Sequence, residues 1–248
     1  MGNFLLEKAS CKDHERVTSF FEGKALRGMF GSVREHENIG SGRRKKRPPL
    51  FVTYENPDGS TERVEVDQFQ HPYMLTMPLL QAPGILMGRN RDLGFPATIQ
   101  SRSHTHDAAR RRMRKLMAAD PRGRSLIWPL DVGNFTKFVA KVGYCYAVFF
   151  MGEVFQPLVL DLILSRQEDC TLGPYFVGGA FEQPGQQYPP LPTKHKFSTV
   201  VRVEKIDSRA FVIARSQFFN DRGMPIYDAV VGELDSDDAK RYFVDSAG

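Results

Sequence analysis

Residues 134–152 read Asn134-Phe-Thr-Lys-Phe-Val-Ala-Lys-Val-Gly-Tyr-Cys-Tyr-Ala-Val-Phe-Phe-Met-Gly152 and give the strongest helix signal in the chain. Asn134 suits the N-cap position, and Lys137 and Lys141 are the only charged residues of the run. The helix is therefore apolar nearly all round, and we expect it to form the core of the protein.

The segments after this helix are mostly strand-like. Runs rich in β-branched and aromatic residues predict three strands, at 197–203, 210–219 and 226–231. Pro157 can start a short helix through Leu164. Residues 171–193 are rich in Gly and Pro, and we expect little regular structure there.

The segments before the core helix mix both kinds of structure. Apolar residues at spacings of three and four predict a helix over 13–34, which ends or bends near its glycines. Strand-like runs on either side of Asn56-Pro-Asp-Gly-Ser60 predict a β-hairpin. The run 73–87 is cut by two prolines and favours an extended chain, and Asp107 can cap a short helix through Ala118. The order of elements predicts an α+β fold.

The chain is basic, and its charge is unevenly distributed. Its 248 residues carry 34 Lys and Arg against 29 Asp and Glu, a net charge of +5. Residues 1–125 hold 22 basic against 14 acidic residues, whereas residues 126–248 hold 12 against 15. A basic first half suits contact with a polyanion, although a well-solvated surface would give the same sum.

Several classes of protein are disfavoured. Three cysteines, odd in number and far apart, do not form a disulfide framework, so we expect a reducing, cytoplasmic location. The first residues lack a secretory signal, and Leu6 stands where a myristoylation motif has Ser or Thr. Charges and Pro157 interrupt the most apolar stretch, 135–164, so no membrane span is predicted.

Few motifs carry chemistry. No nucleophile elbow, P-loop or dinucleotide fingerprint occurs in the chain. Cys11 and His14 form a C-x-x-H pair that suits two ligands of a zinc ion, but a structural zinc site needs four, and a chance pairing is the alternative. His104 and His106 could hold a metal in the same way or belong to a solvated loop.

Two basic clusters are candidates for binding nucleic-acid phosphates. The first is the run Arg43, Arg44, Lys45, Lys46 and Arg47. The second lies on the predicted helix 107–118, where helical spacing brings part of the charge to one face that includes Arg111, Arg114 and Lys115. Such contacts give salt-sensitive affinity without sequence preference, and the alternative is a solvated linker and a solvated helix face.

The order of several segments resembles bacterial proteins with an HNH endonuclease domain. These segments are Leu5-Glu-Lys-Ala-Ser-Cys-Lys-Asp-His14, Val17-Thr-Ser-Phe-Phe-Glu22, Leu26-Arg-Gly-Met-Phe-Gly31, the basic run to Pro49, Phe138-Val-Ala-Lys-Val-Gly-Tyr144, Tyr175-Phe-Val-Gly-Gly179 and Pro225-Ile-Tyr-Asp-Ala-Val-Val-Gly232. The resemblance covers most of the chain.

The resemblance implies a ββα-metal fold that cleaves nucleic acid. In that family a histidine activates water, a divalent cation such as Mg²⁺ or Mn²⁺ polarises the phosphate, and a zinc knuckle braces the small domain. Cys11 and His14 match half of the knuckle, with His14 in place of its second cysteine. His14 and Glu22 are the candidates for a catalytic role.

The resemblance also predicts four regions. They are a partial HNH and zinc-knuckle region at 1–40, a basic linker at 41–49, a hairpin region at 50–92 and an α+β domain at 93–248. The chain starts after the point where the family has its catalytic glutamate-histidine motif and the other half of the knuckle. We therefore expect an incomplete HNH endonuclease with little or no activity. The resemblance implies a divalent cation and a zinc ion, and the alternative is that this chain binds neither.

A different class of function competes with the nuclease. The chain can instead be a non-catalytic module that binds nucleic acid, above all DNA, or another protein. An enzyme acting on a small substrate is a third interpretation, but no motif supports it.

Overall fold

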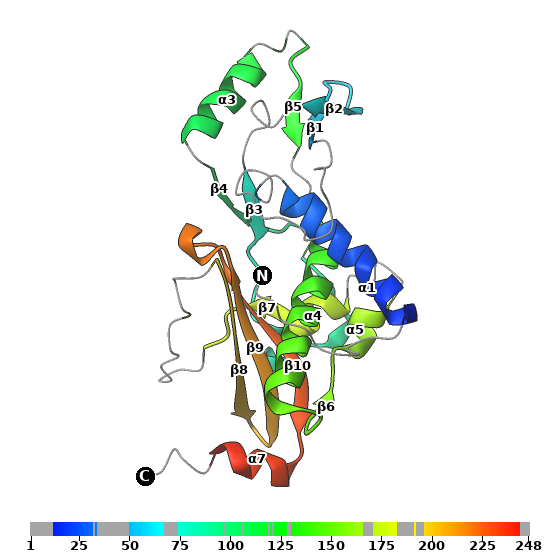
Figure 1. The fold of residues 1–248 in the computed structure, drawn as a ribbon, viewed down its shortest axis with the longest axis vertical. Helices are drawn as coiled ribbons and strands as arrows, with labels where there is room; N and C mark the ends of the chain where they lie inside the picture. The colour runs from blue at the N-terminus through cyan, green and yellow to red at the C-terminus, as the bar shows by residue number, and fades with distance from the viewer. Residues whose placement is uncertain are drawn as a thin grey trace. The chain divides into compact units, whose positions relative to one another are not determined.

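The computed structural model describes residues 12–31, 33, 50–66, 74–96, 98–105, 107–118, 120, 122–127, 130–165, 171–182, 191 and 196–243. Helices and small antiparallel sheets share the chain, which confirms the α+β class (Figure 1). The chain divides into two compact units. Unit 1 comprises residues 1–22, 78–100 and 132–248, and unit 2 comprises residues 23–77 and 101–131.

Unit 1 is built on an antiparallel sheet. Its strands are β6 (Gln156–Pro157), β7 (Val177–Gly179), β8 (Phe197–Ile206), β9 (Arg209–Phe218) and β10 (Ile226–Leu234). Strands β8, β9 and β10 are neighbours in that order, and both β6 and β7 pair with β10. The three strands predicted in this region are confirmed, each at slightly different bounds.

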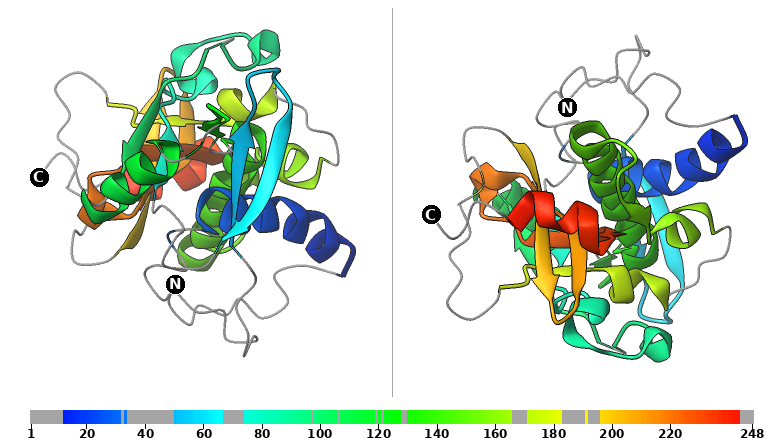
Figure 2. Two further views of the ribbon diagram at one scale, coloured as in Figure 1. Left: turned by 90° about the horizontal axis from the view of Figure 1, so that it is seen from above. Right: turned by 90° about the horizontal axis from the view of Figure 1, so that it is seen from below.

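The predicted core helix is confirmed as α4 (Val132–Met151). It covers one face of the sheet (Figure 2), where Phe135 packs edge-on against Tyr227 with the ring centroids 4.9 Å apart. Gly143 lets the helix come close, because a Cβ there would lie 2.8 Å from the Cβ of Ala214. The lack of a side chain at this position therefore sets the spacing of helix and sheet.

The second face of the sheet is covered by residues of the segment 78–100, which belongs to unit 1. Leu86, in the 3-10 helix η2 (Gly84–Met87), packs with Phe211, Ile213 and Val230. Figure 2 shows this segment on the side of the sheet opposite α4. The two central strands, β9 and β10, therefore alternate between a face that packs on α4 and a face that packs on η2.

Two expectations for unit 1 are wrong. Pro157 does not start a helix, because it pairs with Gly232 at the edge of the sheet. A residue without an N–H is tolerated at a sheet edge. The helix α5 (Leu160–Leu164) begins three residues later. Residues 171–193 are not all irregular, because they contain α6 (Leu172–Phe176) and β7. The remaining elements of unit 1 are η3 (Arg91–Leu93), η4 (Asn220–Arg222), α7 (Ser236–Phe243) and most of α1 (Lys12–Lys24).

Unit 2 contains the predicted hairpin. β1 (Leu50–Glu55) pairs with β2 (Thr61–Val66) and, on its other side, with β5 (Ser125–Ile127). A second small sheet joins β3 (Leu75–Pro78) to β4 (Ser101–His104). The predicted helix 107–118 is confirmed as α3 (Asp107–Ala118).

The first predicted helix differs in its second half. The α-helix α1 ends at Lys24, and Ala25–Met29 continue as a π-helix, η1. Ala25 and Met29, the first and last residues of this π-helix, are both buried. In the part of the chain that the structure describes, no helix is long and apolar enough to cross a membrane.

Candidate nucleic-acid interface

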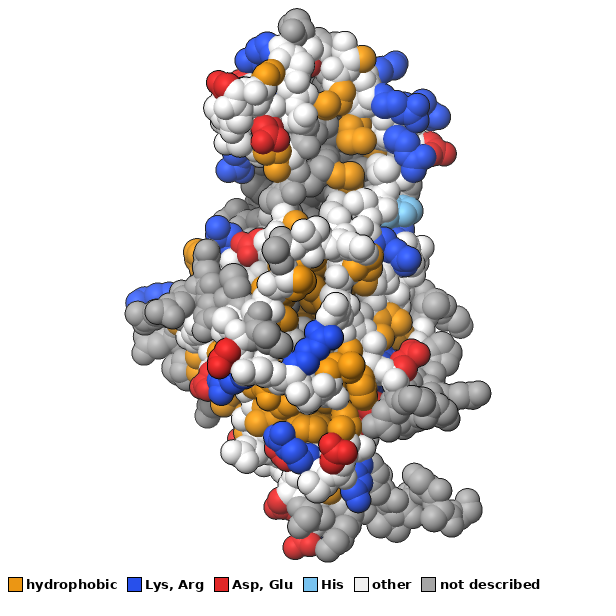
Figure 3. Space-filling view, turned by 180° about the vertical axis from the view of Figure 1, so that it is seen from behind, with side chains coloured by type: hydrophobic (Ala, Val, Ile, Leu, Met, Phe, Trp, Pro, Cys, Tyr) orange, Lys and Arg blue, Asp and Glu red, His pale blue; other side chains and the backbone are white. Residues whose placement is uncertain are grey.

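The exposed face of α3 carries a dense group of cations. Successive residues of an α-helix are about 100° apart, so Arg110, Arg114, Arg111 and Lys115 occupy one continuous arc. All four are exposed, and Ala109, on the opposite side of the helix, is 5% exposed. Figure 3 shows Lys and Arg side chains gathered over this part of unit 2. We call these four residues the α3 basic face.

The α3 basic face is little neutralised by neighbours. Asp107 is its one ion-pair partner among the described residues, 3.5 Å from Arg110. Both members of that pair are at least half exposed, so the pair adds little stability and is easily exchanged for another anion. Cations held this loosely are available to phosphate groups.

Unit 2 as a whole is basic, which also favours binding of a polyanion. Unit 2 contains 17 Lys and Arg against 10 Asp and Glu, a net charge of +7, whereas unit 1 contains 17 against 19, a net charge of −2. The whole positive excess of the chain therefore belongs to unit 2. A local excess of this size raises the concentration of polyanions near the surface.

Other cations of unit 2 are engaged in its structure. Arg124 is 9% exposed, donates to Asp120 and Glu62 at 2.5 Å each, and lies over the Tyr54 ring at 4.1 Å from its centroid. Burial acts to raise the pKa of Asp120, but hydrogen bonds from Arg122 and Arg124 outweigh it and hold that pKa below its usual range. Arg124 therefore braces β1 and the turn before β5, and it is not part of the exposed basic surface.

The other predicted site residues are not brought together by the described structure. Arg43, Arg44, Lys45, Lys46, Arg47 and Cys11 lie outside the described residues, and His14 lies in α1 without a described side chain. Glu22 is half-buried and forms an ion pair with Lys141 of α4, whose Nζ also donates to Thr18 Oγ1 at 2.9 Å. The structure thus gives Glu22 a contact between α1 and α4.

The described residues do not fit a bound metal. Among them, no group of three or more His, Cys, Asp or Glu side chains is placed to hold an ion. Cys145, the cysteine whose thiol is described, is free and half-buried in α4, and burial raises the pKa of that thiol.

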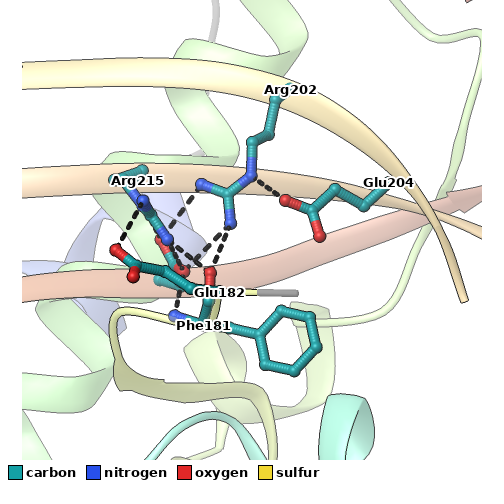
Figure 4. Close-up of polar contacts among 6 residues, drawn as sticks. Phe181, Glu182, Arg202, Glu204 and Arg215 are labelled. Atoms are coloured by element: carbon teal, nitrogen blue, oxygen red, sulfur yellow. Dashed lines mark hydrogen bonds and ion pairs between the residues drawn. The ribbon is translucent and has the colours of Figure 1, made fainter. Parts of the chain in front are cut away.

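Sequence reasoning missed a buried charge cluster on the second face of the unit 1 sheet (Figure 4). Arg202 of β8, Arg215 of β9 and Asp228 of β10 meet there, with Glu204 beside Arg202. The available signal was a single charged residue, Arg215 or Asp228, within the mostly apolar middle of β9 and of β10. The register of the strands places these residues on one face of the sheet.

Comparisons with models of protein families, with curated proteins and with solved structures found no match to this chain.

Proposed function

We propose that the chain binds double-stranded DNA through the α3 basic face. The observation that carries the proposal is the arc of four exposed cations, opposite the buried Ala109, on the unit that holds the whole positive excess. Arg forms bidentate hydrogen bonds with phosphate oxygens, and three of the four residues are Arg. These contacts position a duplex without reading its sequence. The basic run 43–47, which lies outside the described residues, would add to the attraction through its charge.

Salt dependence tests this proposal directly. We expect affinity for a labelled 20-base-pair duplex to fall steeply with added salt, because each phosphate contact releases counterions. The variant Arg111→Gln, Arg114→Gln, Lys115→Gln should reduce the slope of log K against log salt by about 2.7, at about 0.9 per lost contact. Fluorescence anisotropy at several salt concentrations measures both quantities.

A matched control separates α3 from net charge. Arg89→Gln, Arg91→Gln, Arg241→Gln removes the same charge from exposed positions of unit 1. We expect this control to keep the wild-type slope within about 0.5, since no phosphate contact is lost. Equal slopes for the two triple variants would show that binding does not use α3, and no binding at low salt would refute the proposal altogether.

Cleavage is the second candidate function, and it rests on the order of segments that resembles the HNH endonucleases. Within it the cation would be Mg²⁺ or Mn²⁺, the knuckle metal Zn²⁺, and His14 the first candidate for a catalytic group. A plasmid-nicking assay with Mg²⁺, Mn²⁺ or Ni²⁺ distinguishes the two functions. Cleavage that His14→Ala abolishes would support a nuclease, and tight binding without nicking would leave a DNA-binding module.

A further inference from the structure

The strand β8 forms one edge of the unit 1 sheet. In the strand order β6, β10, β9, β8, it has β9 on one side, and no described strand pairs with its other side (Figure 1). Its pairing with β9 runs over ten residue pairs without a bulge. β8 contains no proline, and its lysine, Lys205, stands next to its last residue. A long, regular edge strand of this kind is a template for pairing with another strand.

The backbone groups on the open side of β8 follow from its hairpin with β9. A two-residue loop joins Ile206 to Arg209, and the pair that closes such a loop is hydrogen-bonded across the two strands. Bonded and non-bonded positions alternate along the strand, so Val201 and Val203 direct their N–H and C=O groups away from β9. The open edge therefore offers the donors and acceptors that an added antiparallel strand requires.

The side chains on one face of β8 form a self-complementary series. In order, Val200, Arg202, Glu204 and Ile206 are apolar, positive, negative and apolar. A second copy of β8 in antiparallel orientation presents the same series reversed. Placing Val203 of both copies at a two-fold axis sets Arg202 opposite Glu204 of the other copy, twice. It also sets Val200 opposite Ile206, twice, and both kinds of cross-strand pair are favourable.

The neighbouring registers are unfavourable. Moving the axis from Val203 to Arg202 puts the two guanidinium groups opposite each other, and moving it to Glu204 does the same with two carboxylates. Like charges directly opposite on a sheet are destabilising. Charged residues in β8 also discourage pairing with an apolar strand of another protein, which would set apolar side chains against them. The series therefore favours a second copy of this chain, in one register.

Glu204 is incompletely satisfied within one chain. Its side chain is 2% exposed, and its Oε2 atom accepts no hydrogen bond from any described residue, which is costly for a buried carboxylate. Arg202 contacts the other oxygen, but it also donates to Asp228 at 3.1 Å and to the carbonyl of Phe181, in the loop after β7, at 3.4 Å (Figure 4). In the register with Val203 at the axis, a second guanidinium adds positive charge beside Glu204.

We propose that two copies of the chain associate through β8, antiparallel and with Val203 at the two-fold axis. The sheets of the two copies then join into one, and Arg202 keeps the contacts that it has in the single chain. The same surface is used on both copies, so the assembly closes at two and does not grow into a fibre.

Cysteine cross-linking tests the position of the axis. In a chain with Cys11, Cys145 and Cys170 replaced by Ala, Val203→Cys should give a disulfide-linked dimer, since the two Cα atoms would lie about 5.5 Å apart. Val201→Cys is the matched control: both valines are half-buried on one face of β8, but the two copies of position 201 would stand about 14 Å apart, too far for a disulfide. Non-reducing gel electrophoresis measures both. A dimer from Val201→Cys as abundant as that from Val203→Cys would overturn the inference.

Sedimentation velocity tests the association itself. The mass should rise with protein concentration from 28.1 kDa to twice that value. Val200→Glu should raise the Kd about tenfold, because the added carboxylate, present twice, meets Ile206 and lies diagonal to Glu204 of the other copy. Val154→Glu is the control and should change the Kd by less than about twofold, since Val154 is 39% exposed against 38% for Val200 but lies in no strand. Equal effects of the two variants, or a mass that stays at one chain up to about 200 μM, would also overturn the inference.

Discussion

Asp228 and Arg215 lie directly opposite each other on β10 and β9 and form a two-point ion pair, with Nε to Oδ1 at 2.9 Å and Nη2 to Oδ2 at 2.8 Å. Asp228 is fully buried and Arg215 is 5% exposed. Burial of a charge is costly unless the charge is paired, so each residue depends on the other. The pair joins the two central strands on the face opposite α4.

Asp228→Asn should destabilise unit 1 by about 3–5 kcal/mol, because it leaves the buried Arg215 without the carboxylate that binds it at two points, whereas Arg202 keeps its ion pair with Glu204. Urea unfolding followed by circular dichroism measures the change. Glu233→Gln is the matched control, since Glu233 pairs with the half-exposed Arg209 on the same sheet and should cost less than about 1 kcal/mol. Similar costs for the two variants would contradict the dependence of the sheet on Asp228.

Gly178→Ala should destabilise unit 1 by about 1–3 kcal/mol, through overpacking. A Cβ at Gly178 would lie 2.3 Å from the Gln81 carbonyl oxygen and 2.4 Å from the Pro83 nitrogen, both backbone atoms that cannot turn aside. The control is Gly28→Ala, where a Cβ meets nothing within 4 Å and where stability should stay the same or rise slightly. Thermal unfolding of the two variants compares them, and an unchanged melting temperature for Gly178→Ala would rule out the close approach.

Much of the fold was predictable because its signals are local. The hairpin around Asn56–Ser60, the helix α3 and the apolar helix α4 each depend on residues within the element itself. Pro157 was misassigned because its role is set by a distant partner: a proline can open a helix or sit at a sheet edge, and only the pairing with Gly232 selects the second. The strand β7 was missed for the same reason, since Gly178 and Gly179 have little strand propensity of their own.

The candidate sites also differ in whether their sequence signals are local. Charge and spacing alone pointed to Arg111, Arg114 and Lys115, and the structure adds that Ala109 is the buried side of their helix. The cluster around Asp228 was beyond sequence reasoning, because its members come from three strands and a loop and only the register brings them to one point. The roles predicted for Cys11 and His14 stay predictions.

Glu22 and Lys141 should show a coupling free energy of about 0.5–1 kcal/mol in a double-mutant cycle built from Glu22→Gln and Lys141→Met. Both side chains are partly exposed, at 33% and 24%, so water screens the pair and added salt should reduce the coupling. Denaturant unfolding of the four proteins gives the cycle. A coupling near zero would mean that the two residues act independently, which the contact with Lys141 argues against.

The same cycle bears on the catalytic role predicted for Glu22. If the Lys141 contact is its main role, Glu22→Gln should lower stability and leave any DNA nicking within about threefold of the wild-type rate, far less than the hundredfold or more expected from losing a catalytic group. A loss of nicking without a loss of stability would favour catalysis instead.

Glu233 and Arg209 predict a pH dependence of stability. Arg209 donates to both carboxylate oxygens of Glu233, at 2.8 and 2.5 Å, and these hydrogen bonds hold the pKa of Glu233 below its ordinary value of 4.5. A carboxyl whose pKa is lowered by folding stabilises the folded state at pH values above 4.5, and this contribution is lost as the pH falls through the lowered pKa.

Arg209→Gln should therefore be less stable than the wild type at pH 7, by under about 1 kcal/mol because Arg209 is half-exposed. The difference should shrink as the pH falls through the lowered pKa of Glu233 and vanish once Glu233 is protonated in both proteins, and urea titrations at pH 7 and at successively lower pH values measure it. A difference that stayed constant with pH would show that Arg209 acts through packing on Phe211, over whose ring it lies at 4.6 Å, and not through the charge of Glu233.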